Sequence, residues 1–197
     1  MLIFLESGIA STVGGDHSNY TRPIEVGLIG REGVTALPLI LGNHLATHSI
    51  YMQVARRGHR IAAQPFRDAL AASRTLHALF LRFIQTFMIQ LTQTAVANGR
   101  SKIEERLARW VLMAGDRVDG PMLPLTHEFL SIMLGVRRAG VTDAIHALAG
   151  RGLIKAERGN IRIIDREGLA EHANGCYGEP EREYRRLISN HTDTDGQ

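Results

Sequence analysis

Cysteine is almost absent from the sequence, which has only Cys176 among its 197 residues. A single cysteine excludes an intramolecular disulfide and is typical of a reducing cytoplasm, where thiols stay reduced. It also excludes a cysteine-ligated iron–sulfur cluster built from one chain, because such clusters need about four ligands. We therefore expect a cytoplasmic protein without a cysteine-held cofactor.

Long hydrophobic runs are missing as well. No apolar stretch approaches the ~20 residues that a membrane-spanning helix needs. The apolar N-terminus reaches Glu6 early and has no basic leader, so a signal peptide is not predicted. With 44% hydrophobic and 22% charged residues, the chain has the composition of a globular protein of one large or two small domains, without a membrane as partner.

Recognisable catalytic motifs are also lacking. There is no Ser/His/Asp or Cys/His set at informative spacing, and no Gly-rich phosphate loop precedes a helix. His44 and His48 are four residues apart, with His59 nearby, and such a pair could hold a metal if it lay on a helix. Neither Cys nor an acid lies between them, and the stretch is typical of loop and strand, so we favour surface histidines. The sequence predicts no enzyme, no metal and no cofactor.

Positive charge is modest overall but unevenly placed. The net charge is +3, yet residues 167–197 carry three basic against seven acidic residues, and residues 136–162 carry six basic against two acidic ones. Binding to nucleic acid needs local positive charge, which displaces counterions from phosphates. A solvated basic face would give the same pattern, and residues 1–100 are basic too. Charge alone therefore does not select a DNA-binding region.

The most informative stretch begins at Thr126. Thr126 is a good N-cap, and the apolar residues after it recur at helical spacing up to Gly135, where glycine permits a left-handed turn. A second helix over residues 136–149 would bury one apolar face and turn its polar face outward. Two helices joined by a short turn form a helix-turn-helix, whose second helix enters the DNA major groove.

A β-hairpin is predicted directly after this helix pair. The segments Leu153–Ala156 and Ile161–Ile164 are apolar and partly β-branched. They are separated by Glu157–Asn160, in which Gly and Asn are available for positive φ. A hairpin that follows a helix-turn-helix makes a winged helix.

In the order and spacing of its residues, this stretch resembles the DNA-binding domain of the Crp/Fnr family of bacterial transcription regulators. The matching residues are Leu130, Leu134, Gly135, Val136, Arg138, Val141, Leu148, Gly152, Leu153 and Ile154. The resemblance implies a homodimer that binds double-stranded DNA, with RNA polymerase as a further partner and an effector that the sequence does not identify.

Residues 1–65 read as short strands separated by turns, which favours a barrel or sandwich; the resemblance implies the jelly-roll sensor domain of the family. The candidate strands are Leu2–Leu5, Ile9–Val13, Ile24–Ile29 and Ile50–Val54. Met1 falls inside that β-roll, so we expect the first strands of a typical member to be missing. Cyclic-nucleotide-binding members have an Arg for the phosphate, but here none follows Gly33 until Arg56. Because a buried phosphate without a cation is costly, we do not expect cyclic nucleotide binding.

The longest helical pattern runs from Pro65 to Asn98, with no Gly or Pro within residues 66–98. A long helix with a continuous apolar seam usually has a partner helix, and the resembled family dimerises through this one. The alternative is that the helix packs only on its own β-roll; we favour dimerisation. The seam consists of Leu76, Phe80, Phe83, Phe87, Leu91 and Ala95, widened by Leu79, Ile84 and Met88.

These segments predict an α+β protein with an N-terminal jelly-roll-like β-roll, a long dimerisation helix and a C-terminal winged helix-turn-helix. The first domain would span residues 1–98, and the DNA-binding domain residues 99–177. A polar tail would occupy residues 178–197. The boundary lies at the Asn98–Arg100 break, after which a capping box from Ser101 restarts a helix.

Arg138 is the strongest candidate for reading a base. Two hydrogen bonds from an Arg to guanine are worth about 1–3 kcal/mol of discrimination, and Arg138 matches the base-reading Arg of the family. Ala139 and Asp143 replace the Glu and Arg usual at the next two reading positions, so the common operator of the family is not expected. Ala139 could touch a thymine methyl and Asp143 could accept from cytosine. The other predicted DNA contacts are Thr126, Arg137, Gly140, Thr142, His146, Arg158 and Asn160.

For the last four of these contacts, plain solvent exposure explains the residues equally well. The sequence therefore predicts a dimeric, sequence-specific transcription regulator with a β-roll sensor. The alternative is a ligand- or partner-binding module of the same fold that has lost specific DNA binding.

Overall fold

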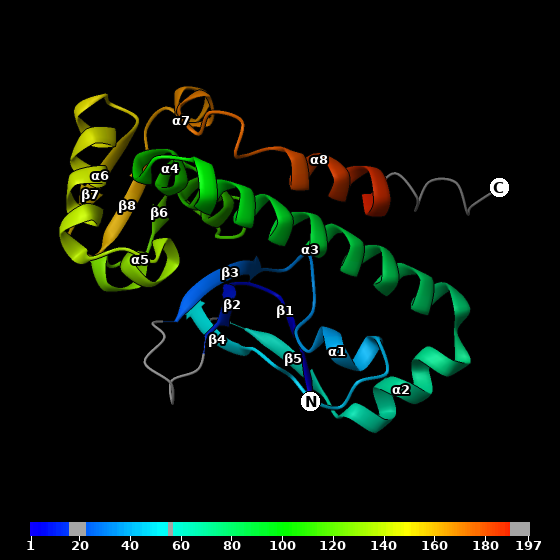
Figure 1. The fold of residues 1–197 in the computed structure, drawn as a ribbon. Coiled ribbons are helices and arrows are strands. Elements are labelled where there is room, and N and C mark those ends of the chain that lie inside the picture. The colour runs from blue at the N-terminus through cyan, green and yellow to red at the C-terminus, as the bar shows by residue number, and fades with distance from the viewer. Residues whose placement is uncertain (16–22, 55–56, 190–197) are drawn as a thin grey trace.

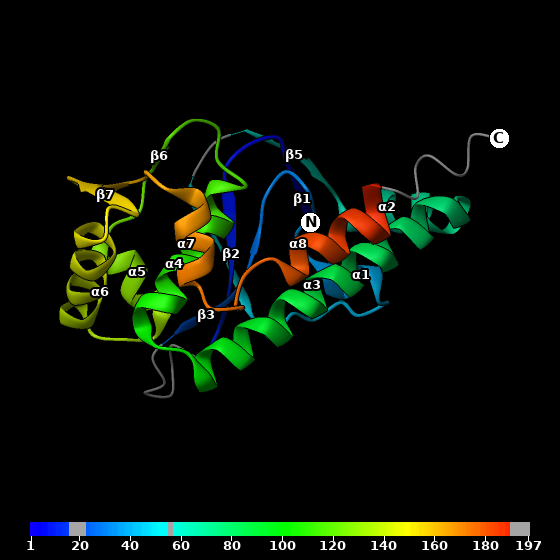
Figure 2. The ribbon, with the colours of Figure 1, turned by 90° about the horizontal axis from the view of Figure 1, so that it is seen from above.

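The computed structural model describes residues 1–15, 23–54 and 57–189. A β-rich N-terminal part lies beneath one long helix, and a smaller, mainly helical part gathers at the far end of that helix (Figure 1). The C-terminal helix then runs back alongside the long one, as both views show (Figures 1 and 2). The predicted α+β arrangement is confirmed.

The N-terminal part contains two small antiparallel sheets. Strand β2 (Ile9–Gly14) lies between β3 (Ile24–Ile29) and β4 (Ser49–Val54), and β1 (Leu2–Leu5) pairs with β5 (Gly58–Ile61). The four predicted strands are confirmed to within a residue at each end.

Strand β5 was not predicted, because Gly58-His59 has the composition of a turn. A Cβ at Gly58 would lie 2.6 Å from the carbonyl oxygen of Phe4 on β1. Glycine here permits close approach of two strands, which is another common use of glycine within a sheet. Arg56, invoked above for the cyclic-nucleotide argument, lies outside the described residues.

Three helices follow or interrupt these strands: α1 (Leu37–Ile40), α2 (Ala63–Ala72) and α3 (Arg74–Arg100). The prediction of one helix from Pro65 to Asn98 is wrong, because Ser73 has extended backbone (φ −131°, ψ 105°) and its side chain accepts a hydrogen bond from Leu76 N (3.2 Å). A serine inside an apolar pattern can thus cap a new helix instead of continuing the old one. Helix α3 also runs through Gly99, where the break was predicted.

The aromatic seam of α3 packs on the chain's own β-roll. Phe80, Phe83 and Phe87 are buried, and the centroid of the Phe80 ring lies 6.1 Å from that of Phe4 on β1. A Cβ on Gly33 of the roll would meet Phe83 at 2.1 Å, so the ring occupies the space that a side chain would take. These phenylalanines therefore pack on the roll of their own chain, and the prediction that they form a dimer seam is wrong.

The second part forms one apolar core around Trp110, which is almost fully buried. Its capping box starts at Lys102, whose N–H donates to Glu105 Oε2 (2.9 Å), one residue later than predicted. The elements, in chain order, are α4 (Ile103–Gly115), β6 (Met122–Leu123), α5 (His127–Leu134), α6 (Arg138–Gly150), β7 (Ile154–Glu157), β8 (Asn160–Ile163) and α7 (Arg166–His172). The predicted helix-turn-helix and hairpin are confirmed.

The chain then forms α8 (Glu179–Tyr184) and a π-helical turn, η1 (Arg185–Ser189). Residues 178–189 are therefore not simply a polar tail, since Tyr184 packs against the aromatic core of the β-roll. Residues 190–197 of the predicted tail lie outside the described residues. Among the residues that the structure describes, none of the helices has the length and hydropathy needed to cross a membrane.

Candidate nucleic-acid interface

The turn between α5 and α6 is fixed at both ends. Thr126 caps α5 by accepting a hydrogen bond from Phe129 N (3.2 Å), as predicted. Gly135 ends the helix with φ 63°, in the left-handed region that favours glycine. A Cβ at Gly135 would also lie 2.9 Å from Ile24 Cδ1 on β3. The turn therefore packs directly against the N-terminal sheet.

An arginine buried in α4 holds the end of α5. The guanidinium of Arg106 donates a hydrogen bond to the carbonyl oxygen of Leu134, one of the last carbonyls of that helix. Burial lowers the pKa of Arg106. A cation at a helix C-terminus also complements the helix dipole. Sequence reasoning missed this contact, because Arg106 looks like any polar residue between apolar ones.

Helix α6 separates cleanly into a buried and an exposed face. Its buried residues are Val141, Ala144, Ile145 and Leu148, which follow the spacing of one helix face. The opposite face is exposed over Arg138, Ala139, Asp143 and His146, and Arg137 caps the helix at its exposed start. The predicted base-reading residues thus share one solvent-facing surface.

Arg138 is held by a residue that the sequence did not single out. Its Nη2 lies 2.9 Å from Glu128 Oε2 in the first turn of α5, and both side chains are mostly exposed. Exposed ion pairs of this kind contribute about 0–1 kcal/mol. Arg138 can therefore leave Glu128 for another acceptor at little cost.

The hydroxyl of Thr142 is engaged within the chain. It donates to the carbonyl oxygen of Arg138 (3.1 Å) and lies 3.2 Å from Nδ1 of His127. His127 and Glu128 therefore bring the first turn of α5 against the first turns of α6. Both could have been suspected from the sequence, since they directly follow the N-cap Thr126.

Gly140 is not demanded by packing. A Cβ there would meet Ile103 at 3.6 Å and Val136 at 3.9 Å, which are ordinary van der Waals distances. A glycine inside a helix costs about 1 kcal/mol relative to alanine, and either tight packing or the close approach of a ligand can explain it. The remaining explanation is close approach of a ligand to the α6 backbone.

The hairpin turn carries an exposed arginine at its tip. Glu157 pairs with Asn160 across the sheet, leaving Arg158 and Gly159 as the turn, and Gly159 takes a φ of 74°. Asn160 keeps a negative φ and donates from Nδ2 to the carbonyl oxygen of Arg158 (3.2 Å), so it supports the turn instead of supplying its positive φ. Within the described residues, no hydrogen bond or ion pair joins Arg158 or Asn160 to α6.

The histidines that were considered as possible metal ligands make other contacts. His44 and His59 are exposed and contact Arg67 and Glu6, at 3.3 and 2.6 Å respectively. Across residues 1–15, 23–54 and 57–189, no group of three His, Cys, Asp or Glu side chains is placed to hold a metal ion.

Comparisons with known proteins agree with this architecture. Residues 105–172 match the family model of the Crp-like helix-turn-helix domain. A transcriptional regulator of the Crp/Fnr family from Eubacterium rectale is similar over 88% of this chain and 81% of its own, with 19% identity and a TM-score of 0.66. A CRP-family regulator from Thermus thermophilus covers 88% of both chains (17% identity, TM-score 0.62). FixK2 from Bradyrhizobium japonicum covers 86% of this chain and 85% of its own (13% identity, TM-score 0.61). Among curated proteins, none matches.

The structural likenesses establish the Crp-like fold: a β-roll joined by a long helix to a winged helix-turn-helix. The family model covers residues 105–172, which form the winged helix-turn-helix part of this fold. The predicted resemblance is confirmed.

Proposed function

We propose that the protein is a sequence-specific DNA-binding transcription regulator that acts as a homodimer in the bacterial cytoplasm. The observation that carries the proposal is the exposed face of α6, which begins with two arginines and is presented by a fixed turn. A helix of this kind enters the major groove with its N-terminal residues at the base edges. Arg138 then donates to guanine, while Ala139 and Asp143 set a preference of their own.

Residues around the reading face are suited to phosphates. Arg137 at the N-cap of α6 and Arg158 at the tip of the hairpin are both exposed cations. Gly140 leaves the backbone of α6 open to close approach, and the N-terminus of a helix attracts anions. Thr126 offers its hydroxyl in the adjoining first turn of α5. These contacts fix the register of the protein on DNA without carrying sequence information.

In this proposal, dimerisation uses an exposed stripe of α3 that shares Met88 and Ala95 with the predicted seam. Exposed residues recur along the helix at alternating spacings of four and three, at Leu81, Gln85, Met88, Thr92 and Ala95. This is the heptad spacing of a two-stranded coiled coil. Leu81 and Met88 are 45% and 55% exposed, which is unusual for two large apolar side chains on one helix face. Pairing of two α3 helices covers this stripe and sets two α6 helices at a fixed separation.

The β-roll serves as the sensor in this proposal, for a signal that remains unnamed. Phenylalanines of α3 fill the space between that helix and the roll, where Phe87 would touch a Cβ on Gly27 at 2.9 Å.

The test is enrichment of bound duplexes from a random library by the full-length protein. We expect one enriched palindromic sequence, bound with an affinity that falls steeply as salt rises, because counterions are released from phosphates. Arg138→Ala should then weaken operator binding by roughly five- to 150-fold, the equivalent of 1–3 kcal/mol, and relax selection at one base pair in each half-site.

A matched control is Arg60→Ala, which removes the same charge from an exposed position on β5. This variant should keep both the affinity and the base preference. If no sequence is enriched, the winged helix is a ligand- or partner-binding module and the proposal fails. If Arg138→Ala binds the operator as tightly and selectively as the parent, α6 is not the reading helix.

A further inference from the structure

The C-terminal segment returns from the DNA-binding part to the β-roll. Helix α8 follows the winged helix in sequence, yet it lies along α3 in both views (Figures 1 and 2). Tyr184 and Ile188 pack against the aromatic core formed by α3 and the roll. Residues 176–189, which we call the strap, therefore touch both parts of the molecule.

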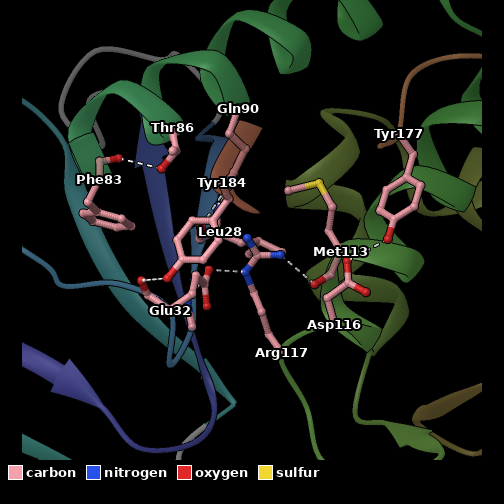
Figure 3. A network of polar contacts seen from close by, with 11 residues as sticks. Leu28, Glu32, Phe83, Thr86, Gln90, Met113, Asp116, Arg117, Tyr177 and Tyr184 are labelled. Carbon is pink, nitrogen blue, oxygen red and sulfur yellow. Dashed lines mark hydrogen bonds and ion pairs between the residues drawn. The ribbon is translucent and has the colours of Figure 1, made fainter. Parts of the chain in front are cut away.

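At its far end the strap is tied to the roll through Glu32. The hydroxyl of Tyr184 donates to the carbonyl oxygen of Glu32 (3.0 Å). The carboxylate of Glu32 accepts from Arg117 Nε at the end of α4 (2.6 Å) and from Gly30 N (3.1 Å). Glu32 is thus the point where the roll, the strap and the DNA-binding part meet (Figure 3).

Arg117 is committed to this junction. Its Nη1 donates to the carbonyl oxygen of Met113 (2.9 Å), and its side chain is buried. Burial lowers the pKa of Arg117, but the carboxylates of Glu32 and Glu181 outweigh burial and the pKa is raised. A buried guanidinium that lost Glu32 would be left under-paired, so the contact is held firmly while the junction stays closed.

The near end of the strap is tied to the DNA-binding part. The hydroxyl of Tyr177 donates to Asp116 Oδ2 (2.9 Å), and Arg166 Nη2 donates to both Asp116 Oδ1 (2.5 Å) and Tyr177 (2.7 Å). Arg109 Nε donates to the carbonyl oxygen of Cys176 (3.0 Å). This end is anchored within the DNA-binding part, whereas the Tyr184 end contacts the roll.

Beneath the strap lies a cavity of about 320 Å³. Leu28 and Phe87 form part of its apolar lining, and the ion pairs Arg117–Glu32 and Arg166–Asp116 line its polar side. A cavity means that the strap lacks dense packing below it, and cavities reduce the cost of opening relative to a filled core. The Tyr184 end can therefore detach while the two parts remain folded.

We infer that the strap is a regulatory latch that fixes the DNA-binding part against the β-roll in the operator-competent arrangement. The reading face of α6 is open to solvent while the strap is docked, which is why the docked state is assigned as the competent one. Detachment of Tyr184 removes a hydrogen bond to the backbone of Glu32, whose carboxylate pairs with Arg117, so the roll holds the DNA-binding part less firmly and the two α6 helices of a dimer lose their common spacing. The inference rests on the proposed DNA binding for its functional consequence but not for the latch itself.

The test uses two substitutions in the full chain. Tyr184→Phe removes only the hydroxyl bonded to Glu32 and should weaken operator binding about two- to tenfold, as expected for one hydrogen bond. Tyr184→Ala also removes the ring and should weaken it by more than tenfold, with no change for a non-operator duplex. Arg182→Ala is the control, because Arg182 lies on the same helix and, among the described residues, its side chain pairs with Glu179, three residues before it.

Amide hydrogen exchange tests, without DNA, whether the strap holds the roll. In Tyr184→Ala, amides of residues 30–35 and 179–189 should exchange faster together, while those of α6 stay as protected as in the parent. Unchanged exchange in residues 30–35 would overturn the latch. Unchanged or tighter operator binding, despite faster exchange, would overturn its role as the competent arrangement. If no duplex binds the parent protein, the proposed function fails, and hydrogen exchange alone tests whether the strap is a latch. If Tyr184→Ala does not fold, operator binding and hydrogen exchange are both measured on Tyr184→Phe.

Discussion

Glu25 makes the folding of this protein sensitive to pH. It lies on β3 with no exposed surface, and neither carboxylate oxygen has a hydrogen-bond partner among the described residues. The nearby hydroxyl of Ser11 donates to Gln53 (2.8 Å) instead. Burial raises the pKa of Glu25 from 4.5 to about 8, against smaller lowering effects of Ser11, Arg109 and Arg117.

The direction in which stability changes with pH depends on whether the folded or the unfolded chain binds more protons. The pKa of Glu25 is higher in the folded than in the unfolded chain, so between pH 4.5 and about 8 the folded state holds more protons. The free energy of unfolding therefore decreases as pH rises through this window. At 1.36 kcal/mol for each pH unit, the loss is about 3 kcal/mol by pH 7 and about 5 kcal/mol above pH 8. A loss of this size is a large fraction of the stability of an ordinary domain.

The assay is urea unfolding of the parent and of Glu25→Gln at pH 5, 7 and 8.5. The neutral amide has nearly the same shape, so the variant should match the parent near pH 5 and exceed it by about 3 kcal/mol at pH 7. Glu171→Gln, at an exposed position on α7, is the control and should follow the parent. A parent curve parallel to that of Glu25→Gln from pH 5 to 8.5 would show that this carboxylate is not protonated in the fold.

Three further outcomes are expected. Gly135→Ala should destabilise the protein by at least about 1–2 kcal/mol in thermal unfolding, because its φ of 63° disfavours a Cβ that would also strike Ile24; unchanged stability would contradict the turn geometry. Glu128→Gln should tighten operator binding by up to about fivefold in a titration, because Arg138 is released from an exposed ion pair; weaker binding would show that Glu128 orients Arg138 productively. Met88→Glu should shift the sedimentation coefficient towards that of the monomer, because it places like charges opposite each other in the dimer. A dimer as stable as that of the parent would show that the interface does not include the exposed stripe of α3.

The winged helix was predictable from the sequence because its signals are local. Thr126 caps a helix, Gly135 supplies a left-handed turn, and the apolar positions of α6 recur at one period; each is readable within a few residues. The strands of the roll were found for the same reason. The second half of the hairpin turn was misjudged only in detail, since Gly159 takes the positive φ and Asn160 does not.

The features that sequence reasoning missed depend on what lies across the fold. The stripe of phenylalanines on α3 has the spacing of a dimer seam, but spacing cannot say whether a partner helix or the chain's own sheet covers it. Gly58 has the composition of a turn until the backbone of Phe4 is beside it. A glutamate is rarely fully buried, yet Glu25 has no exposed surface in the fold. Long-range packing overrides local preference in each case.

The central sheet explains how a signal in the roll could reach the DNA-binding part. Side chains of successive strand residues point to opposite faces, and here the two faces belong to different cores. Ile29 on β3 packs with the phenylalanines of α3, whereas its neighbour Leu28 packs with the core around Trp110, as Ile9 and Val54 do. A close-packed interior has few voids to absorb a shift of these strands. Any displacement of β3 by α3 must therefore move Leu28, and with it the support beneath α4 and α5.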